Sequence, residues 1–331
     1  MVNNSHTARQ LDWDPEYAEW RRPFGDMTRV PVYNTVLEFR HFSDTMLRAV
    51  WSQLPEQPTI QRTVHKVASH DGVEIDITRF ATAEQTASQD PLPAWLYFHG
   101  GGMVAASVDI FAPQIAKLAA DSGVQLFGVE YRLAPEHPDP TPVEDCYAAL
   151  KWISENAAEL KVDPKRLGLM GDSAGGGLAA GTSLLARDRG LNPPLARQIL
   201  IYPMLDDRSL LAMTPQSALA SFATVPYESL VLCWEAYVGK DKAGKADAQV
   251  SPYAAPSRAT DLSDLPATYI DVGNLDLFRD ECAMFAARLA AADVDVEFHM
   301  FSGVPHGFES AANIGITKRA YVGRLKAMTS L

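Results

Sequence analysis

The chain has 331 residues, of which 47% are hydrophobic and 21% charged, a composition typical of a folded protein with a substantial core. Its net charge of −12 argues against nucleic acid or an anionic membrane as partner, because both are bound through clustered Lys and Arg. The three cysteines have no metal-type spacing and predict neither a disulfide framework nor a metal site: Cys146, Cys233 and Cys282.

The first 60 residues show no strand pattern. Met1 to Arg22 is polar and acidic, unlike a signal peptide, and no run approaches the roughly 18 apolar residues of a membrane span, so we expect a cytoplasmic protein. Aromatic residues recur at helical spacing here and again in residues 206–250. Such stripes are typical of a core, yet the second follows a strand's carboxyl end. We predict a helical cap from 1–60 and 206–250 over a catalytic core of 61–205 and 251–331.

From residue 61 onward, strand-like and helix-like runs alternate. An antiparallel hairpin is expected around Asp71-Gly72, with strands at 64–69 and 73–80. Further strands are expected at 94–98, 124–129, 166–170, 199–202, 268–272 and 296–301, of which 94–98 and 166–170 are predicted to be buried. The alternation predicts an α/β fold, in which helices cover both faces of a mostly parallel sheet.

The segment Gly171-Asp172-Ser173-Ala174-Gly175 lies between an expected strand and an Ala-rich expected helix over 175–187. A serine at the tip of a strand, tight turn and helix is typical of a hydrolase nucleophile. The small flanking residues allow the strained turn to approach its neighbours. The alternative is a phosphate-binding loop, which is disfavoured because no Gly-Lys-Ser/Thr follows.

A second glycine-rich segment, His99-Gly100-Gly101-Gly102, follows the expected strand over 94–98 directly. Consecutive glycines leave backbone amides uncovered, so that these can stabilise a developing oxyanion, and the loss of one such donor costs about 2.7 to 4 kcal/mol of barrier. The alternative is a flexible turn, which its position directly after a buried strand disfavours.

A serine nucleophile needs a base and an orienting acid. His306 lies just past the last expected strand, where the binding crevice of an open α/β sheet is found. Asp276 follows the strand 267–272 at once, 30 positions before His306. Its rivals are Asp271, Asp280 and Glu281. Of these, Asp280 and Glu281 are expected to begin the next helix, where carboxylates usually serve as caps.

With these motifs the chain resembles the hormone-sensitive lipase family of esterases, within the α/β-hydrolase superfamily. The matching segments are His99–Gly102, Tyr131–Glu136, Gly171–Gly175, Asp276–Asp280 and His306–Phe308. The resemblance implies Ser173 as nucleophile, His306 as base and Asp276 as acid. It further implies an oxyanion hole made by the amides of Gly101, Gly102 and Ala174. Leu277 departs from the family, which usually has proline there, without touching a catalytic position.

The resemblance implies hydrolysis of short- to medium-chain carboxylic esters through an acyl-enzyme, with no metal or organic cofactor. The expected partner is a small-molecule ester, and a homodimer is left open. Two alternatives stay open. Relatives that act as small-molecule receptors usually lose a triad member, whereas all three positions are filled here. Dehydratases and acyl transferases keep the site, and fold and triad do not fix the leaving group.

Overall fold

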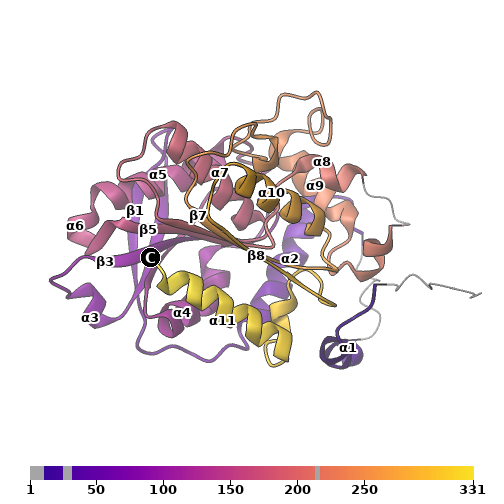
Figure 1. Ribbon diagram of the computed structural model, residues 1–331, viewed down its shortest axis with the longest axis horizontal. Helices are drawn as coiled ribbons and strands as arrows, with labels where there is room; N and C mark the ends of the chain where they lie inside the picture. The colour runs from indigo at the N-terminus through magenta and orange to yellow at the C-terminus, as the bar shows by residue number, and fades with distance from the viewer. Residues whose placement is uncertain (1–10, 25–31, 213–216) are drawn as a thin grey trace, which may run out of the picture.

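The computed structural model describes residues 11–24, 32–212 and 217–331. The described residues form one eight-stranded sheet in the order β1-β2-β4-β3-β5-β6-β7-β8 (Figure 1). The β1–β2 hairpin is antiparallel and the sheet is mostly parallel, as predicted, and β2–β4 is a second antiparallel pair. The strands span Gln61–Ala68 (β1), Glu74–Ala81 (β2), Leu92–Phe98 (β3), Gln125–Val129 (β4), Val162–Asp172 (β5), Arg197–Ile201 (β6), Ala267–Gly273 (β7) and Val296–Phe301 (β8).

Helices cover both faces of the sheet, which confirms the predicted layering (Figure 1). Helices α4 (Val108–Ser122) and α11 (Gly315–Thr329) pack together on one face. Helices α5 (Thr141–Glu155), α7 (Ala174–Asp188) and α10 (Arg279–Ala291) lie on the other. The short elements are α3 (Ala83–Thr86), α6 (Ala157–Leu160), η4 (Pro256–Arg258) and η5 (Phe308–Ser310).

The nucleophile strand β5 is longer than the sequence predicts. The strand was expected at 166–170, but β5 begins at Val162 and includes Pro164. The reason is an irregularity in its pairing with β3, where Leu92 faces Val162 and Ala94 already faces Leu167. The extra residues bulge out of the ladder, and a bulge is one of the few places where a strand tolerates proline.

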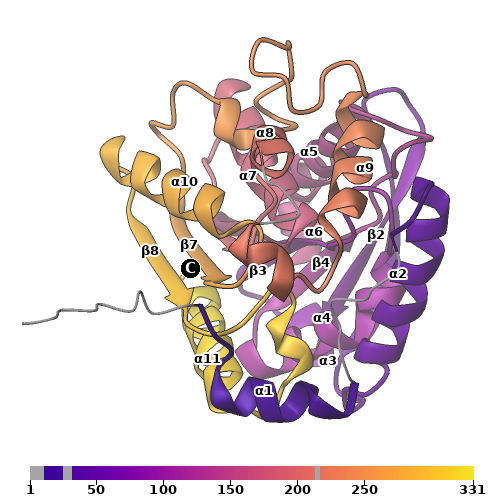
Figure 2. The same cartoon turned by 90° about the vertical axis from the view of Figure 1, so that its right-hand side faces the viewer.

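The two stretches outside the alternation lie together at the carboxyl ends of the parallel strands (Figures 1 and 2). The first contains α1 (Pro15–Arg21), η1 (Arg22–Phe24) and α2 (Val36–Trp51). The second contains α8 (Asp207–Ala212), η3 (Ala218–Phe222) and α9 (Tyr227–Val238), and α2 packs against both α9 and α4. Residues 1–10, 25–31 and 213–216, which the cap prediction also included, lie outside the described residues.

The local sequence explains where the N-terminal helices begin. Asp14 caps α1, because its carboxylate accepts hydrogen bonds from the amides of Glu16 and Tyr17. Thr35 caps α2 in the same way through the amide of Glu38. Across the part of the chain that the structure describes, no helix combines the length and the apolar character needed to cross a membrane.

Candidate active site

Ser173 lies in the tight turn between β5 and α7, with backbone angles of φ 56° and ψ −119°. This left-handed conformation is strained for a serine, and hydrogen bonds hold it in place. The Ser173 amide donates to the Ile201 carbonyl at 2.8 Å, and the Ser173 carbonyl accepts from the amides of Gly177 and Met204 at 3.0 and 2.9 Å. A side chain at Gly175 would collide with the Phe98 carbonyl, so only glycine lets the turn pack this closely on β3.

The structure brings His306 and Asp276 to Ser173. The Nε2 atom of His306 lies 3.0 Å from Ser173 Oγ, and its Nδ1 atom lies 2.8 Å from Asp276 Oδ2. The other Asp276 oxygen accepts from the Phe278 amide at 2.9 Å, which fixes the carboxylate plane. Because Nδ1 faces a carboxylate, the proton belongs on Nδ1 and Nε2 is free to accept from the serine hydroxyl. The rings of Tyr202 and Phe278 hold the imidazole edge-on at centroid distances of 4.5 and 5.1 Å.

The three rival acids are engaged elsewhere. Asp280 begins α10 as predicted, with its exposed carboxylate on Arg279 at 2.7 Å. Asp271 is buried against Arg324 through two hydrogen bonds of 2.7 and 2.9 Å. Glu281 accepts from the Leu205 amide at 2.7 Å. None of the three contacts His306 through a hydrogen bond among the described residues.

The glycine-rich loop lies beside Ser173 and has the conformation that its sequence indicates. Gly101 and Gly102 have φ angles of 119° and 65°. A Cβ on Gly102 would come within 2.5 Å of Cys233 Sγ on α9, so α9 packs directly on this loop. In the part of the chain that the structure describes, the amides of Gly101, Gly102 and Ala174 have no backbone acceptor. These three amides are therefore free to donate to a ligand.

The buried side chains of His99 and Tyr131, to which the sequence assigned no role, support the glycine-rich loop. The imidazole of His99 stacks on Tyr131 at 4.3 Å, and the Tyr131 hydroxyl donates to the His99 carbonyl at 2.7 Å. Burial lowers the pKa of His99 to about 4, so that the ring is neutral at physiological pH. Tyr131 belongs to the Tyr131–Glu136 segment that carries the family resemblance, but the sequence alone did not show that it packs on His99.

Helix α2 also holds this region, through contacts to the residues that follow the glycine-rich loop. Arg40 donates to the carbonyls of Val104 and Ala134, the latter at 2.7 Å, and forms a two-bond ion pair with Glu136 at 2.6 and 2.9 Å. One turn further, Asp44 accepts from the Ala106 amide at 2.7 Å. No local pattern marked Arg40 or Asp44, because their partners lie at least 60 residues away in the chain.

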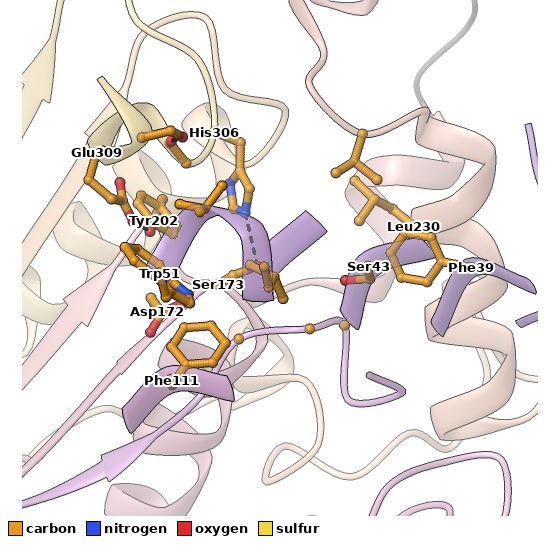
Figure 3. A pocket seen from close by; sticks show the side chains of 18 residues that line it. Phe39, Ser43, Trp51, Phe111, Asp172, Ser173, Tyr202, Leu230, His306 and Glu309 are labelled. Carbon is orange, nitrogen blue, oxygen red and sulfur yellow. Dashed lines mark hydrogen bonds between the residues drawn. The ribbon is translucent and has the colours of Figure 1, made fainter. Parts of the chain in front are cut away.

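A cavity of about 150 Å³ opens over Ser173 and His306 (Figure 3). Its apolar wall comes largely from α2, which contributes Phe39, Leu47, Val50 and Trp51. The core interpretation of the aromatic stripe in 206–250 holds for Trp234 and Tyr237, which are fully buried. The aliphatic side chains of Val225 and Leu230 line the cavity in their place. Phe222 packs edge-on against Trp13 at 4.9 Å, which joins the two stretches.

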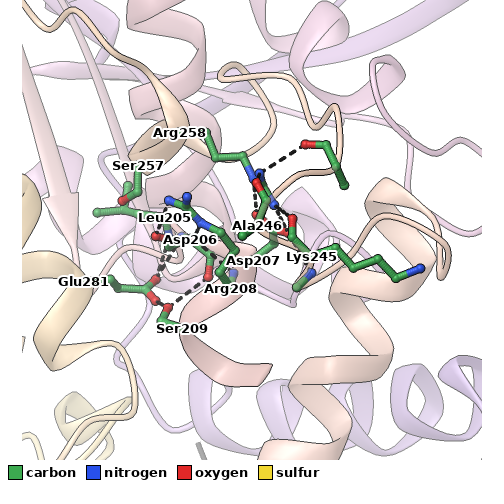
Figure 4. Close-up of polar contacts among 12 residues, drawn as sticks. Leu205, Asp206, Asp207, Arg208, Ser209, Lys245, Ala246, Ser257, Arg258 and Glu281 are labelled. Atoms are coloured by element: carbon green, nitrogen blue, oxygen red, sulfur yellow. Dashed lines mark hydrogen bonds and ion pairs between the residues drawn. The ribbon is translucent and has the colours of Figure 1, made fainter. Parts of the chain in front are cut away.

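A network of polar contacts anchors the start of the 206–250 stretch (Figure 4). Glu281 accepts from the amides of Leu205 and Asp206 and from the Ser209 hydroxyl. Asp207 is buried against Arg258 through bonds of 2.6 and 2.8 Å. Burial raises the pKa of Glu281 to about 8, although its hydrogen bonds act in the opposite direction.

No group of three or more metal-ligating side chains occurs within 11–24, 32–212 and 217–331. All three cysteines are buried and unpaired.

Comparison with known proteins places this geometry in a family. A family model described as the alpha/beta hydrolase fold matches residues 95–310. The chain belongs to the α/β-hydrolase family. This α/β-hydrolase is 35% identical over 293 residues to esterase LipI of Mycobacterium tuberculosis, a match covering 86% of the chain and 89% of the relative. It is 39% identical over 226 residues to carboxylesterase NlhH of the same species, a match covering 68% of the chain and 69% of the relative.

Among solved structures, the α/β-hydrolase resembles a bacterial heroin esterase with a TM-score of 0.84 and 36% identity. That superposition covers 96% of this chain and 97% of the other. Together these matches confirm both the predicted fold and the resemblance to the hormone-sensitive lipase family.

Proposed function

We propose that the protein is a serine carboxylesterase in which Ser173, His306 and Asp276 form the catalytic triad. The observation that carries this proposal is the continuous hydrogen-bonded line from Ser173 Oγ through His306 to Asp276, with distances of 3.0 and 2.8 Å. The similarity to proteins named esterase and carboxylesterase supports the same reaction class. The intact line also argues against a receptor that has lost hydrolysis.

In the proposed mechanism Ser173 Oγ attacks the ester carbonyl while His306 Nε2 takes the hydroxyl proton. The amides of Gly101, Gly102 and Ala174 stabilise the oxyanion of the tetrahedral intermediate. His306 then returns the proton to the departing alcohol, which leaves an acyl group on Ser173. A water molecule, deprotonated by His306, attacks this acyl-enzyme, and His306 returns the proton to Ser173 Oγ as the acid leaves. Asp276 stabilises the imidazolium in both halves of the reaction.

The size of the cavity favours the small end of the short- to medium-chain range. Its volume of about 150 Å³ is below the roughly 300 to 1,000 Å³ of pockets that take drug-sized ligands. The apolar side chains of α2 suit a short alkyl group, so we expect acetate and butyrate esters to be better substrates than longer ones.

We further propose that residues 1–60 and 206–250 act as a cap, while 61–205 and 251–331 carry the catalytic machinery. The contributions of α2 and of Val225 and Leu230 to the cavity support this division. A cytoplasmic location stays a prediction, which the three unpaired cysteines support because thiols persist in a reducing compartment.

The test is hydrolysis of p-nitrophenyl acetate and butyrate with and without a chelator. We expect turnover that the chelator leaves unchanged, and a loss of roughly 10⁴-fold or more in kcat on replacing Ser173→Ala. Ser330→Ala, at an exposed position near the C-terminus, is the matched control and should retain wild-type activity. Circular dichroism would show that both variants fold. Near-native turnover by Ser173→Ala, or activity that chelator abolishes and zinc restores, would contradict the proposal.

A further inference from the structure

One wall of the cavity combines two carboxyl groups with three aromatic rings. Figure 3 shows Asp172 and Glu309 to one side of Ser173, together with Trp51, Phe111 and Tyr202. The opposite side carries Phe39, Ser43 and Leu230. We call the first group of five residues the carboxyl–aromatic wall. It lies within the cavity that the proposed hydrolytic site uses.

Asp172 brings a buried carboxyl group with one free oxygen to this wall. Its side chain is deeply buried, since the residue is only 4% exposed. The hydroxyl of Tyr97 donates to Oδ1, whereas Oδ2 accepts no hydrogen bond from the described residues. Oδ2 lies 2.7 Å from the place where a Cβ on Gly100 would be, and therefore directly beside the glycine-rich loop. Asp172 also lines the cavity, so this oxygen is available to a ligand there, and a cation would compensate the poor solvation of its charged form.

Glu309 presents the same situation three residues after His306. The hydroxyl of Tyr202 donates to its Oε1 atom, while Oε2 is buried and has no partner among the described residues. The neighbouring cation is Arg324, whose Nε and Nη2 atoms are already bound to Asp271 at 2.7 and 2.9 Å. The charge of Arg324 acts on Glu309 and Asp172 without a hydrogen bond among the described residues, and it lowers their pKa values against the larger effect of burial.

The charges at this wall do not balance within the protein. No Lys or Arg is among the described residues that line the cavity. Burial raises the pKa of Asp172 to about 7 and also raises that of Glu309. An anionic substrate group would hold both carboxyl groups in their neutral form, and a plain alkyl group would bring no counter-charge to either. A cation would restore both carboxyl groups to their charged form, and aromatic faces beside it add attraction.

Resting on the esterase function proposed above, we infer that the carboxyl–aromatic wall binds the ammonium group of an amine-bearing ester. The preferred substrates are then small esters that carry a protonated or quaternary amine on one side of the scissile bond. Selectivity arises because the isosteric neutral ester fills the same space but satisfies neither carboxyl group.

Acetylcholine and 3,3-dimethylbutyl acetate form a matched pair of probes, since they differ by a quaternary nitrogen in place of a carbon. Binding of each to the Ser173→Ala protein would be measured by calorimetry, so that neither probe is turned over. We expect acetylcholine to bind roughly tenfold more tightly, in line with desolvated cation–aromatic and charge contacts. Adding Glu309→Gln should bring the ratio of the two affinities close to one. Adding Glu74→Gln, which removes an exposed carboxylate on β2, should leave the ratio unchanged.

Equal affinities for the two probes, or no measurable binding of either, would overturn the inference. A preference that survives both Glu309→Gln and Asp172→Asn would overturn it as well, because the cation would then be held elsewhere. If either variant fails to fold, the ratio in the Ser173→Ala protein alone still decides. Turnover of p-nitrophenyl acetate by the wild-type protein tests the esterase proposal separately. Turnover without a cation preference would contradict only the proposed role of the carboxyl–aromatic wall. A cation preference without turnover would contradict only the esterase proposal.

Discussion

Asp276 and Asp280 stand four residues apart in the chain, and their surroundings give them different roles. Asp276 lies in the turn after β7, where it is buried and divides its two oxygens between His306 and the Phe278 amide. Asp280 lies in the first turn of α10 with a side chain that is 68% exposed. There it complements the helix dipole and pairs with Arg279, an interaction that is weak in water. Position relative to the strand end thus separates the two carboxylates.

We predict that Asp276→Asn loses roughly 10⁴-fold in kcat, because the amide favours the wrong imidazole tautomer while preserving the shape. Asp280→Asn should keep most of its turnover and lose at most about 1 kcal/mol in the free energy of unfolding. Steady-state hydrolysis of p-nitrophenyl butyrate and urea titration of both variants would check this. An inactive Asp280→Asn beside an active Asp276→Asn would reverse the assignment.

Sequence could place the three triad candidates because each follows the carboxyl end of a strand, and strand ends are visible in the pattern. The residues that support them could not be found this way. Glu309 contacts Tyr202 across 107 positions, and Glu281 contacts Leu205 across 76. Arg40 reaches Val104 across 64 positions. Contacts of this separation leave no periodic or local signal, and only the folded chain reveals them.

At the scale of elements, helix α2 both lines the cavity and holds the glycine-rich loop. Phe39 and Trp51 are buried toward the site, while Arg40 and Asp44 bind backbone groups between Val104 and Ala134. The loop that carries Gly101 and Gly102 is thus fixed by a helix more than 60 residues earlier in the sequence. Arg40 is a positioning residue in this arrangement, since it touches the loop and not the reacting atoms.

Arg40→Ala is therefore predicted to lower kcat roughly 10- to 100-fold while changing KM little, because loosened amides stabilise the transition state less well. Arg40→Lys should recover only part of the loss, since an ammonium cannot reproduce the two-bond pair with Glu136. Arg48→Ala is the matched control: it lies two turns further along α2 and forms an exposed ion pair with Asp109. Equal effects of Arg40→Ala and Arg48→Ala on kcat would contradict a positioning role.

The elements differ in how far their sequence determines them. The core strands could be predicted to within a few residues, because parallel strands buried on both faces form continuous apolar runs between turn residues. Strand β5 was the exception, since a bulge that holds Pro164 out of the ladder lets the strand begin at Val162. The aromatic stripe of 206–250 allowed both a core and a cap interpretation, for a different reason. Helical spacing alone does not say which face meets the core, and here Trp234 and Tyr237 face inward.

At the scale of the whole molecule, the excess of acidic side chains includes several that are buried in the interior. Burial raises the pKa of five carboxyl groups: Glu130 to about 7, Asp139 to about 6, Asp172 to about 7, Glu281 to about 8, and Glu309 above its ordinary value. In the folded state each of these groups keeps its proton up to a higher pH than it does in the unfolded chain. The net charge of −12 adds self-repulsion that grows as these protons leave.

The direction of these pKa shifts predicts how the free energy of unfolding changes with pH. A carboxyl group with a raised pKa in the folded state contributes stability that is fully present below its unfolded pKa. That contribution is lost as the pH rises through the folded pKa, which for Glu281 means the window from 4.5 to about 8. One such group changes the free energy of unfolding by up to about 1.4 kcal/mol per pH unit. The protein should therefore become less stable between about pH 5 and pH 8.

Replacing Glu281→Gln should flatten this decline, because the amide keeps an acceptor for the Leu205 amide and carries no titratable proton. Denaturant unfolding of the wild type and the variant across pH 5 to 8.5 would measure the two slopes. Glu74→Gln, at an exposed position, is the matched control and should follow the wild-type curve. Parallel pH profiles for the wild type and Glu281→Gln would show that Glu281 is already ionised in the fold. In that case its three hydrogen bonds, to the amides of Leu205 and Asp206 and the Ser209 hydroxyl, outweigh its burial.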